Sequence, residues 1–252
     1  MTQDKTVLIT GASSGFGKAT AQLLAKEGFQ LILVARRLEK LQELKDTLQI
    51  NTHIASFDIR EKNAVKVFFE NLPKQFHNID ILVNNAGLAK GLDTVDTADL
   101  ENWDTMVDTN IKGLLYMTRH TLENMKQRNQ GLIINIGSIA ATIPYKGSNV
   151  YGATKAFVRQ FSKNMRTDLF GTDIKITTIE PGMAETEFST VRFNGDSEKA
   201  HAVYQGARAL TPENIAHTIL WVINQPTNVN IDTIEIMPID QTFGGIAIHR
   251  KE

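Results

Sequence analysis

Three side chains that can bind or transfer a proton lie within one short stretch of the chain. They are the hydroxyl of Ser138, the phenol of Tyr151 and the ammonium of Lys155. Tyr151 and Lys155 are four positions apart, so on a helix they would share one face. A free phenol has a pKa near ~10, and a neighbouring ammonium is expected to lower it. Tyr151 is therefore suited to exchange a proton with an alcohol or a ketone, while Ser138 holds the reacting oxygen.

The flanking segments are expected to place these side chains at the carboxyl end of a buried strand. Residues 131–137 form an apolar, β-branched run, which is typical of a strand in a parallel sheet. Residues 151–170 carry apolar side chains at helical spacing. Taken alone, a tyrosine and a lysine at this spacing are more often a feature of a helix surface. The interpretation therefore depends on the rest of the chain.

Expected strands and helices alternate along the whole sequence. The expected strands cover residues 6–10, 31–35, 53–57, 80–84, 131–137, 174–179 and 231–237, and the helices cover residues 17–27, 38–48, 64–76, 100–128, 151–170 and 212–224. This alternation predicts an α/β fold, with helices on both faces of a parallel sheet. Residues 183–206 have weaker periodicity and are interpreted as a mobile lid over a site. Residues 1–252 are expected to form a single domain with a tail at residues 239–252.

A turn rich in glycine and serine joins the first expected strand to the first helix. Its three glycines allow a tight turn and a close approach of a ligand to the backbone. The N-terminus of the helix offers free N–H groups to a pyrophosphate, and two serines add hydroxyl donors. The turn therefore predicts a dinucleotide site, whose contacts would be Gly11, Ser13, Ser14, Gly15, Phe16 and Gly17.

The end of the second expected strand indicates which dinucleotide binds. An acidic residue at this place bonds the ribose of NAD, whereas an arginine accommodates the 2′-phosphate of NADP. The chain has Arg36 and Arg37 there, which predicts NADP(H), although the pair is also compatible with an ordinary basic start to the next helix. Asp58, followed by Ile59, ends the third strand and is placed to accept a hydrogen bond from the adenine amino group. A capping role in the loop is the alternative for Asp58.

The composition argues against several other classes of function. The formal net charge is −1, so nothing points to nucleic acid or to an anionic membrane surface. The chain has no cysteine, which excludes disulfides, thiolate metal sites and a cysteine nucleophile and is compatible with a reducing cytosol. No apolar run approaches the ~20 residues that a membrane span needs, and the N-terminus has no signal-peptide pattern. The six histidines are scattered, so no metal is expected, and a cytoplasmic location is predicted.

Together these residues resemble the short-chain dehydrogenase/reductase family. The matching features are the TGxxxGxG turn at residues 10–17, the NNAG segment at residues 84–87, Asn110, Ser138, the YxxxK pair at residues 151–155 and the PGxxxT segment at residues 181–186. Their order and spacing agree from about residue 5 to residue 240. The resemblance implies a Rossmann-type, doubly wound parallel sheet of about seven strands. It also implies hydride transfer between a nicotinamide and the carbon of an alcohol or carbonyl.

The resemblance also implies a role for each matching residue. Tyr151 would be the acid or base, and Lys155 would lower its pKa and bond the nicotinamide ribose. Ser138 would hold the substrate oxygen, Asn110 would anchor a water in the proton relay, and Thr186 would bond the nicotinamide carboxamide. Further cofactor contacts would come from Asn85, Ala86, Gly87, Pro181 and Gly182.

Three further segments are similar to the NADP-dependent 3-hydroxy acid dehydrogenases within that family. They are residues 150–161, residues 186–196, and an ending with Met237-Pro238 and His249-Arg250. This subgroup acts on serine, allo-threonine and 3-hydroxypropionate and forms homotetramers. A homotetramer is therefore expected here, with the apolar tail at residues 243–248 packed on a partner chain.

A 3-hydroxy acid carries a carboxylate close to its reacting carbon, and that charge needs a cationic partner once water is excluded. Arg192 in the expected lid is the first candidate, and Lys90 and Lys146 are the alternatives. Two other functions stay open. One is a general ketone or aldehyde reductase with an apolar pocket, and the other is a non-catalytic NADP-binding scaffold. The presence of both Tyr151 and Lys155 argues against the scaffold.

Overall fold

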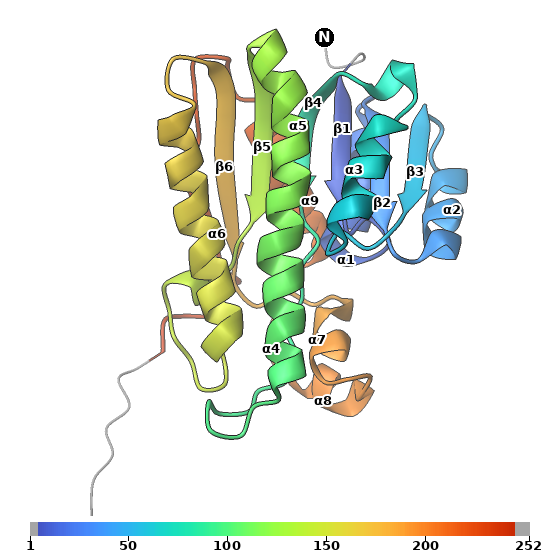
Figure 1. Cartoon of the computed structure of the whole chain (residues 1–252). Helices are drawn as coiled ribbons and strands as arrows, with labels where there is room; N and C mark the ends of the chain where they lie inside the picture. The colour runs from blue at the N-terminus through green and yellow to red at the C-terminus, as the bar shows by residue number, and fades with distance from the viewer. Residues whose placement is uncertain (1–4, 245–252) are drawn as a thin grey trace, which may run out of the picture.

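A computed structural model describes residues 5–244 and contains a seven-stranded sheet in which all the paired strands are parallel. The strand order is β3-β2-β1-β4-β5-β6-β7 (Figure 1). The strands are β1 (Thr6–Thr10), β2 (Gln30–Ala35), β3 (Thr52–Ser56), β4 (Ile79–Asn84), β5 (Gln130–Ile136), β6 (Asp173–Pro181) and β7 (Thr233–Ile236). The predicted seven-stranded, doubly wound sheet is confirmed. The order reverses between β1 and β4, and a crevice at such a point is where ligands bind in open α/β sheets.

Helices cover both faces of the sheet (Figure 1). They are α1 (Gly15–Lys26), α2 (Leu38–Thr47), α3 (Lys62–Glu70), α4 (Leu100–Val107), α5 (Leu114–Arg128), α6 (Asn149–Asp168), α7 (Glu187–Arg192), α8 (Ser197–Ala202) and α9 (Pro212–Ile223). Short turns η1 (Lys74–Phe76), η2 (Asp108–Gly113) and η3 (Ile139–Ala141) complete the described structure. None of the described helices is long and apolar enough to cross a membrane.

The sheet is buried on both faces because successive side chains of each strand point to opposite sides. Val7 and Ile9 of β1 pack in one cluster with side chains of α1, α2 and α9. Leu8, between them, packs in a second cluster with side chains of α3, α5 and α6. Two buried faces require an apolar residue at nearly every strand position, which is why the strands are continuous apolar runs in the sequence.

Two predicted helices differ from the structure. The helix expected over residues 64–76 ends at Glu70, and η1 follows it. Pro73 lies between the two and has no N–H to continue the helical hydrogen bonds. The helix expected over residues 100–128 is interrupted by η2, one turn of π-helix that contains Asn110 and ends at Gly113.

The segment interpreted as a lid, residues 183–206, contains two short helices that the sequence analysis did not identify. The Thr186 hydroxyl accepts a hydrogen bond from the N–H of Phe188 at the start of α7. The Asp196 carboxylate accepts one from the N–H of Lys199 in α8. Each helix has six residues, which is too short for an apolar periodicity to show. Residues 245–252 of the predicted tail lie outside the described part of the chain.

Candidate active site

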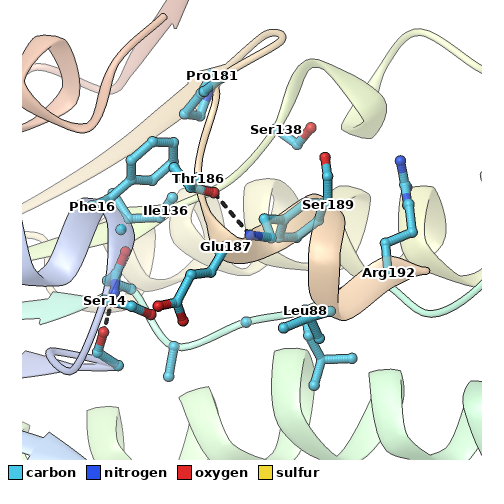
Figure 2. A pocket seen from close by; sticks show the side chains of 18 of the residues that line it. Ser14, Phe16, Leu88, Ile136, Ser138, Pro181, Thr186, Glu187, Ser189 and Arg192 are labelled. Carbon is cyan, nitrogen blue, oxygen red and sulfur yellow. Dashed lines mark hydrogen bonds between the residues drawn. The ribbon is translucent and has the colours of Figure 1, made fainter. Parts of the chain in front are cut away.

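A cleft of about 570 Å³ lies at the carboxyl edge of the sheet. It is lined by nearly all the predicted site residues: Gly11, Ser13, Ser14, Gly15, Phe16, Arg36, Arg37, Asp58, Ile59, Asn85, Ala86, Gly87, Ser138, Tyr151, Lys155, Pro181, Gly182, Thr186 and Arg192. Two predicted residues, Gly17 and Asn110, do not line the cleft and lie behind its wall. Figure 2 shows the cleft with α7 beside it.

The three side chains that can bind or transfer a proton meet where β5 and α6 come together. Ser138 follows β5 and caps η3, and its hydroxyl accepts a hydrogen bond from the N–H of Ala140 at 3.1 Å. Tyr151 and Lys155 lie in α6 and are both buried. The Lys155 ammonium donates to the carbonyl of Ile136 at 2.8 Å, and its nitrogen lies 5.9 Å from the centre of the Tyr151 ring.

Burial shifts the pKa values of Tyr151 and Lys155 in opposite directions, because it disfavours the charged form of each. It raises the pKa of Tyr151 to about 12, although a hydrogen bond with Ser138 and the charge of Arg192 act in the opposite sense. It lowers the pKa of Lys155 to about 8. The expected net lowering of the Tyr151 pKa is therefore wrong for the protein alone. Desolvation outweighs the favourable charges around the phenol.

Asn110, in η2, forms hydrogen bonds with residues next to the cleft. Its amide oxygen accepts from the N–H of Leu88 at 2.9 Å, and its amide nitrogen donates to the Leu88 carbonyl at 2.8 Å and to the Thr154 hydroxyl at 3.0 Å. A methyl group added at Gly87 would lie 3.3 Å from the Asn110 oxygen and 3.4 Å from the Lys155 nitrogen. Asn110 and Lys155 therefore approach the same glycine. Single π-turns are frequent at functional sites.

The glycine turn before α1 is closed tightly against the loop after β4. A methyl group added at Gly11 would lie 2.9 Å from the Cα of Ala86, and one added at Gly17 would clash with the carbonyl oxygen of Gly11. The Asn85 amide donates to the carbonyls of Thr10 and Gly11, at 2.9 and 3.2 Å. These contacts explain why the turn carries glycine at these positions.

The start of α1 is suited to bind an anion. Ser14 occupies the N-cap position, but its side chain makes no capping hydrogen bond. The first N–H groups of α1 therefore remain for a ligand, with the positive end of the helix dipole behind them. This arrangement fits the pyrophosphate of a dinucleotide.

Arg36 and Arg37 lie at the end of β2, as expected, and Arg37 makes two contacts that the sequence analysis did not anticipate. Its guanidinium donates to the Ser13 hydroxyl from Nε at 3.3 Å and from Nη2 at 3.1 Å. Its Nη2 also forms an ion pair with the Glu187 carboxylate at 2.9 Å. Glu187 is the first residue of α7, so this pair joins the lid segment to the glycine turn.

Asp58 faces the cleft but is already paired within the protein. Its carboxylate accepts from the backbone N–H of Arg60 at 3.0 Å and from the Arg60 guanidinium at 2.9 and 2.7 Å. Burial acts to raise the pKa of Asp58, but these hydrogen bonds hold it below its usual range. The structure thus favours pairing of Asp58 within its own loop over a free acceptor. Arg60 was not identified from the sequence.

Arg192, at the last turn of α7, extends over the catalytic side chains. Its guanidinium carbon lies 5.2 Å from the centre of the Tyr151 ring and 5.5 Å from that of Phe188. Its Nη2 donates to the Tyr145 hydroxyl at 2.7 Å. Its Nε is buried and has no hydrogen-bond partner among residues 5–244. Neither alternative lysine lines the cleft. Lys90 donates a hydrogen bond to the side chain of Asn194, and Lys146 is exposed.

Tyr145 and Phe188 also line the cleft and were missed by the sequence analysis. Tyr145 lies in the loop between η3 and α6, where no motif or periodicity distinguishes it. Phe188 lies in α7 and packs against Tyr151, with 5.6 Å between the ring centres. Their positions depend on contacts between distant segments. No group of histidine, aspartate or glutamate side chains suited to a metal ion occurs in the described part of the chain.

Three features together define a class of nicotinamide-dependent dehydrogenase. They are the order of the parallel sheet, the glycine turn at its switch point, and the buried Ser–Tyr–Lys set at its carboxyl edge. Residues 5–196 match the short chain dehydrogenase family, and the chain belongs to that family. The resemblance inferred from the motifs is thus confirmed.

Particular relatives cover almost the whole chain. An NADP-dependent 3-hydroxy acid dehydrogenase of Salmonella typhi is 53% identical over 246 residues, which are 97% of this chain and 99% of the relative. A serine 3-dehydrogenase of Rhizobium radiobacter is 49% identical, with 98% of each chain covered. The closed form of a serine dehydrogenase complexed with NADP+ superposes with a TM-score of 0.96 at 52% identity, covering 98% of this chain and 100% of that one.

Proposed function

We propose that the protein is an NADP-dependent dehydrogenase of small 3-hydroxy acids, of the serine, allo-threonine and 3-hydroxypropionate type. The observation that carries this proposal is the position of Arg192. A guanidinium with an unpaired, buried Nε lies 5.2 Å from the ring of Tyr151. In a 3-hydroxy acid, one carbon atom separates the carboxylate from the reacting carbinol carbon. Such a carboxylate would accept a hydrogen bond from the Arg192 Nε, and the guanidinium matches carboxylate geometry. The relatives named for 3-hydroxy acids and serine support the same substrate class.

Oxidation of such a substrate removes a hydride from C3 and a proton from its hydroxyl. When bound, NADP+ would supply the acceptor for the hydride. In this proposal Ser138 donates a hydrogen bond to the substrate oxygen, and Tyr151 receives its proton. Lys155, which is held by the Ile136 carbonyl, stabilises the phenolate by its charge. Asn110 anchors the relay that returns the proton to solvent.

The cofactor residues follow the shape of the cleft. Gly11, Gly15 and Gly17 allow the pyrophosphate to approach the start of α1, and Ser13, Ser14 and Phe16 complete the turn. Arg36 and Arg37 hold the 2′-phosphate, and Asp58 and Ile59 border the adenine. Further cofactor contacts are assigned to Asn85, Ala86, Gly87 and Tyr151, and contacts with the nicotinamide and its ribose to Lys155, Pro181, Gly182 and Thr186. The same relatives support NADP(H) as the cofactor.

The alternative is a general reductase of neutral ketones, which would use the same Ser138, Tyr151 and Lys155. The apolar contribution of Phe188 to the cleft favours it, and the cation of Arg192 argues against it. A non-catalytic scaffold would have no use for a buried tyrosine and lysine at the carboxyl edge of the sheet.

Steady-state kinetics of wild-type protein and Arg192→Ala separate the two enzyme functions. The substrates are L-serine, 3-hydroxypropionate and a neutral ketone of similar size, with NADP(H) throughout. We expect Arg192→Ala to raise KM for the two acids by about tenfold or more, since a charge-assisted hydrogen bond contributes ~1.5–3 kcal/mol. KM for the neutral ketone should change little. Equal losses on all three substrates would show that Arg192 only shapes the cleft.

We further propose one catalytic domain over residues 1–252, a homotetramer in solution and a cytoplasmic location. The tetramer is supported by the short apolar segment at residues 243–248, of which Phe243 is described and exposed. The absence of cysteine is compatible with the cytoplasm. Light scattering that gives the mass of a monomer, with or without NADPH, would refute the tetramer.

A further inference from the structure

We propose that Glu187 adjusts cofactor specificity by occupying Arg37 until a 2′-phosphate displaces it. This inference rests on the proposed NADP(H) preference and adds a residue that opposes it. Glu187 would make NADP(H) binding weaker and more easily reversed, without affecting a cofactor that lacks the 2′-phosphate.

The contact lies between the lid segment and the predicted phosphate site. The Glu187 carboxylate lies 2.9 Å from Nη2 of Arg37, and the same Nη2 donates to the Ser13 hydroxyl. All three residues line the cleft. In Figure 2 the Glu187 side chain extends from α7 toward Ser14, at the start of α1, whereas Arg192 lies at the other end of the helix. In the protein without a cofactor, the anion bound by Arg37 is thus the Glu187 carboxylate.

Charge determines what happens when a cofactor arrives. A 2′-phosphate that uses the guanidinium of Arg37 brings negative charge close to the Glu187 carboxylate, and like charges at this range repel each other. The Glu187–Arg37 pair must then open or weaken. A cofactor without the 2′-phosphate has no group to replace the carboxylate, so it leaves the pair intact.

The size of the effect follows from exposure. The Arg37 and Glu187 side chains are 43% and 48% exposed, so water and salt screen their attraction. Exposed ion pairs are weak, and the expected change in affinity is roughly two- to fivefold. Such a change is small compared with the proposed contribution of the two arginines. Glu187 therefore modulates the cofactor preference and does not create it.

Isothermal titration calorimetry with NADPH and with NADH tests this inference without any turnover. Glu187→Gln should lower the dissociation constant of NADPH by roughly two- to fivefold and change that of NADH by less than about 1.5-fold. Adenosine 2′,5′-bisphosphate and AMP should show the same contrast. Glu185→Gln is the matched control, because Glu185 is an exposed carboxylate of the same segment that does not line the cleft.

A second background identifies the partner of Glu187. In Arg37→Gln protein, the further change Glu187→Gln should leave NADPH affinity unaltered, because Glu187 then has no Arg37 guanidinium to pair with. Weaker NADPH binding by Glu187→Gln, or equal gains for NADPH and NADH, would overturn the inference while the proposed function stands. If wild-type protein bound NADH as tightly as NADPH, the proposed cofactor preference would fail, and this inference with it.

Discussion

At the scale of single residues, burial sets the protonation states that the proposed chemistry begins from. With pKa values of about 12 for Tyr151 and about 8 for Lys155, the phenol is protonated at pH 7 and the ammonium is charged. This state is ready to donate a proton to a carbonyl. In the oxidative direction the phenolate must form first, and the nearby cations Lys155 and Arg192 favour it.

Removal of the phenol hydroxyl should stop catalysis and leave the cleft intact. We expect Tyr151→Phe to retain less than about a tenth of wild-type kcat while its NADPH dissociation constant stays largely unchanged. Lys155→Ala should impair both quantities, because Lys155 is proposed to contact the cofactor as well. Steady-state kinetics and calorimetry measure the two effects. If Tyr151→Phe kept more than that fraction of turnover, the acid/base assignment would be wrong.

The pH dependence should differ between the two directions of the reaction. Below the pKa of Tyr151 each unit of pH raises the phenolate fraction about tenfold, so kcat/KM for oxidation should rise from pH 6 to about 8. Above about 8 Lys155 loses its charge and stabilises the phenolate less, so the rise should flatten. Reduction should stay nearly constant over this range because Tyr151 remains protonated. Parallel pH profiles in both directions would contradict the assignment of Tyr151 as the group that exchanges the proton.

At the scale of elements, the π-turn η2 connects the fold to the site. It turns Asn110 inward, where it is 2% exposed and makes hydrogen bonds with Leu88 on one side and Thr154 on the other. It also ends at Gly113, where an added methyl group would lie 2.6 Å from Cδ1 of Ile59. A regular helix over the same residues would have no reason to carry asparagine and glycine at these positions.

The amide of Asn110 should therefore matter for stability as well as for catalysis. Asn110→Ala leaves the N–H and the carbonyl of Leu88 without these partners, and each unsatisfied buried group costs ~1–3 kcal/mol. We expect urea denaturation to show a loss of about 2–6 kcal/mol in the free energy of unfolding. Asn164→Ala, at an exposed position near the C-terminal end of α6, is the control and should cost much less. Equal losses in the two variants would refute the structural role of Asn110.

The sequence predicted those elements whose residues follow a period or a local motif. The ends of all seven strands were predicted to within one or two residues, because both sheet faces demand apolar side chains. The glycine turn was found because its backbone geometry restricts it to a few residue types. The short helices α7 and α8 were missed because six residues show no period.

Contacts between distant segments could not be predicted in the same way. Glu187 meets Arg37 across 150 positions, and Arg192 meets Tyr145 across 47. No local pattern encodes either pair. The pKa of Tyr151 was expected to fall, and this expectation was wrong. The spacing of Tyr151 and Lys155 in the sequence shows that a positive charge is near the phenol, but it does not show how deeply the phenol is buried. Asn110 was identified from its place among the family motifs, but its partner Leu88 was visible only in the fold.

At the scale of the whole molecule, the strand order brings these parts to one edge. The strand order reverses between β1 and β4, so the glycine turn after β1 and the loop after β4 pack side by side at the carboxyl edge, and both line the cleft. β5 and β6 then add Ser138 and the segment that leads to α7. One end of α7 contacts the predicted phosphate site and its other end contacts Tyr151. The lid segment thus joins the proposed cofactor and substrate ends of a single cleft.

The proposed function requires this cleft to oxidise 3-hydroxy acids with NADP+. The most direct test compares kcat/KM for 3-hydroxypropionate oxidation with NADP+ and with NAD+ as the varied cofactor, at saturating acid. Charge-assisted bonds from Arg36 and Arg37 are each expected to contribute ~1.5–3 kcal/mol, and ~1.4 kcal/mol is a factor of ten. We expect kcat/KM to be at least about tenfold higher with NADP+ than with NAD+. Equal values for the two cofactors, or no oxidation of the acid with either, would contradict the proposed function.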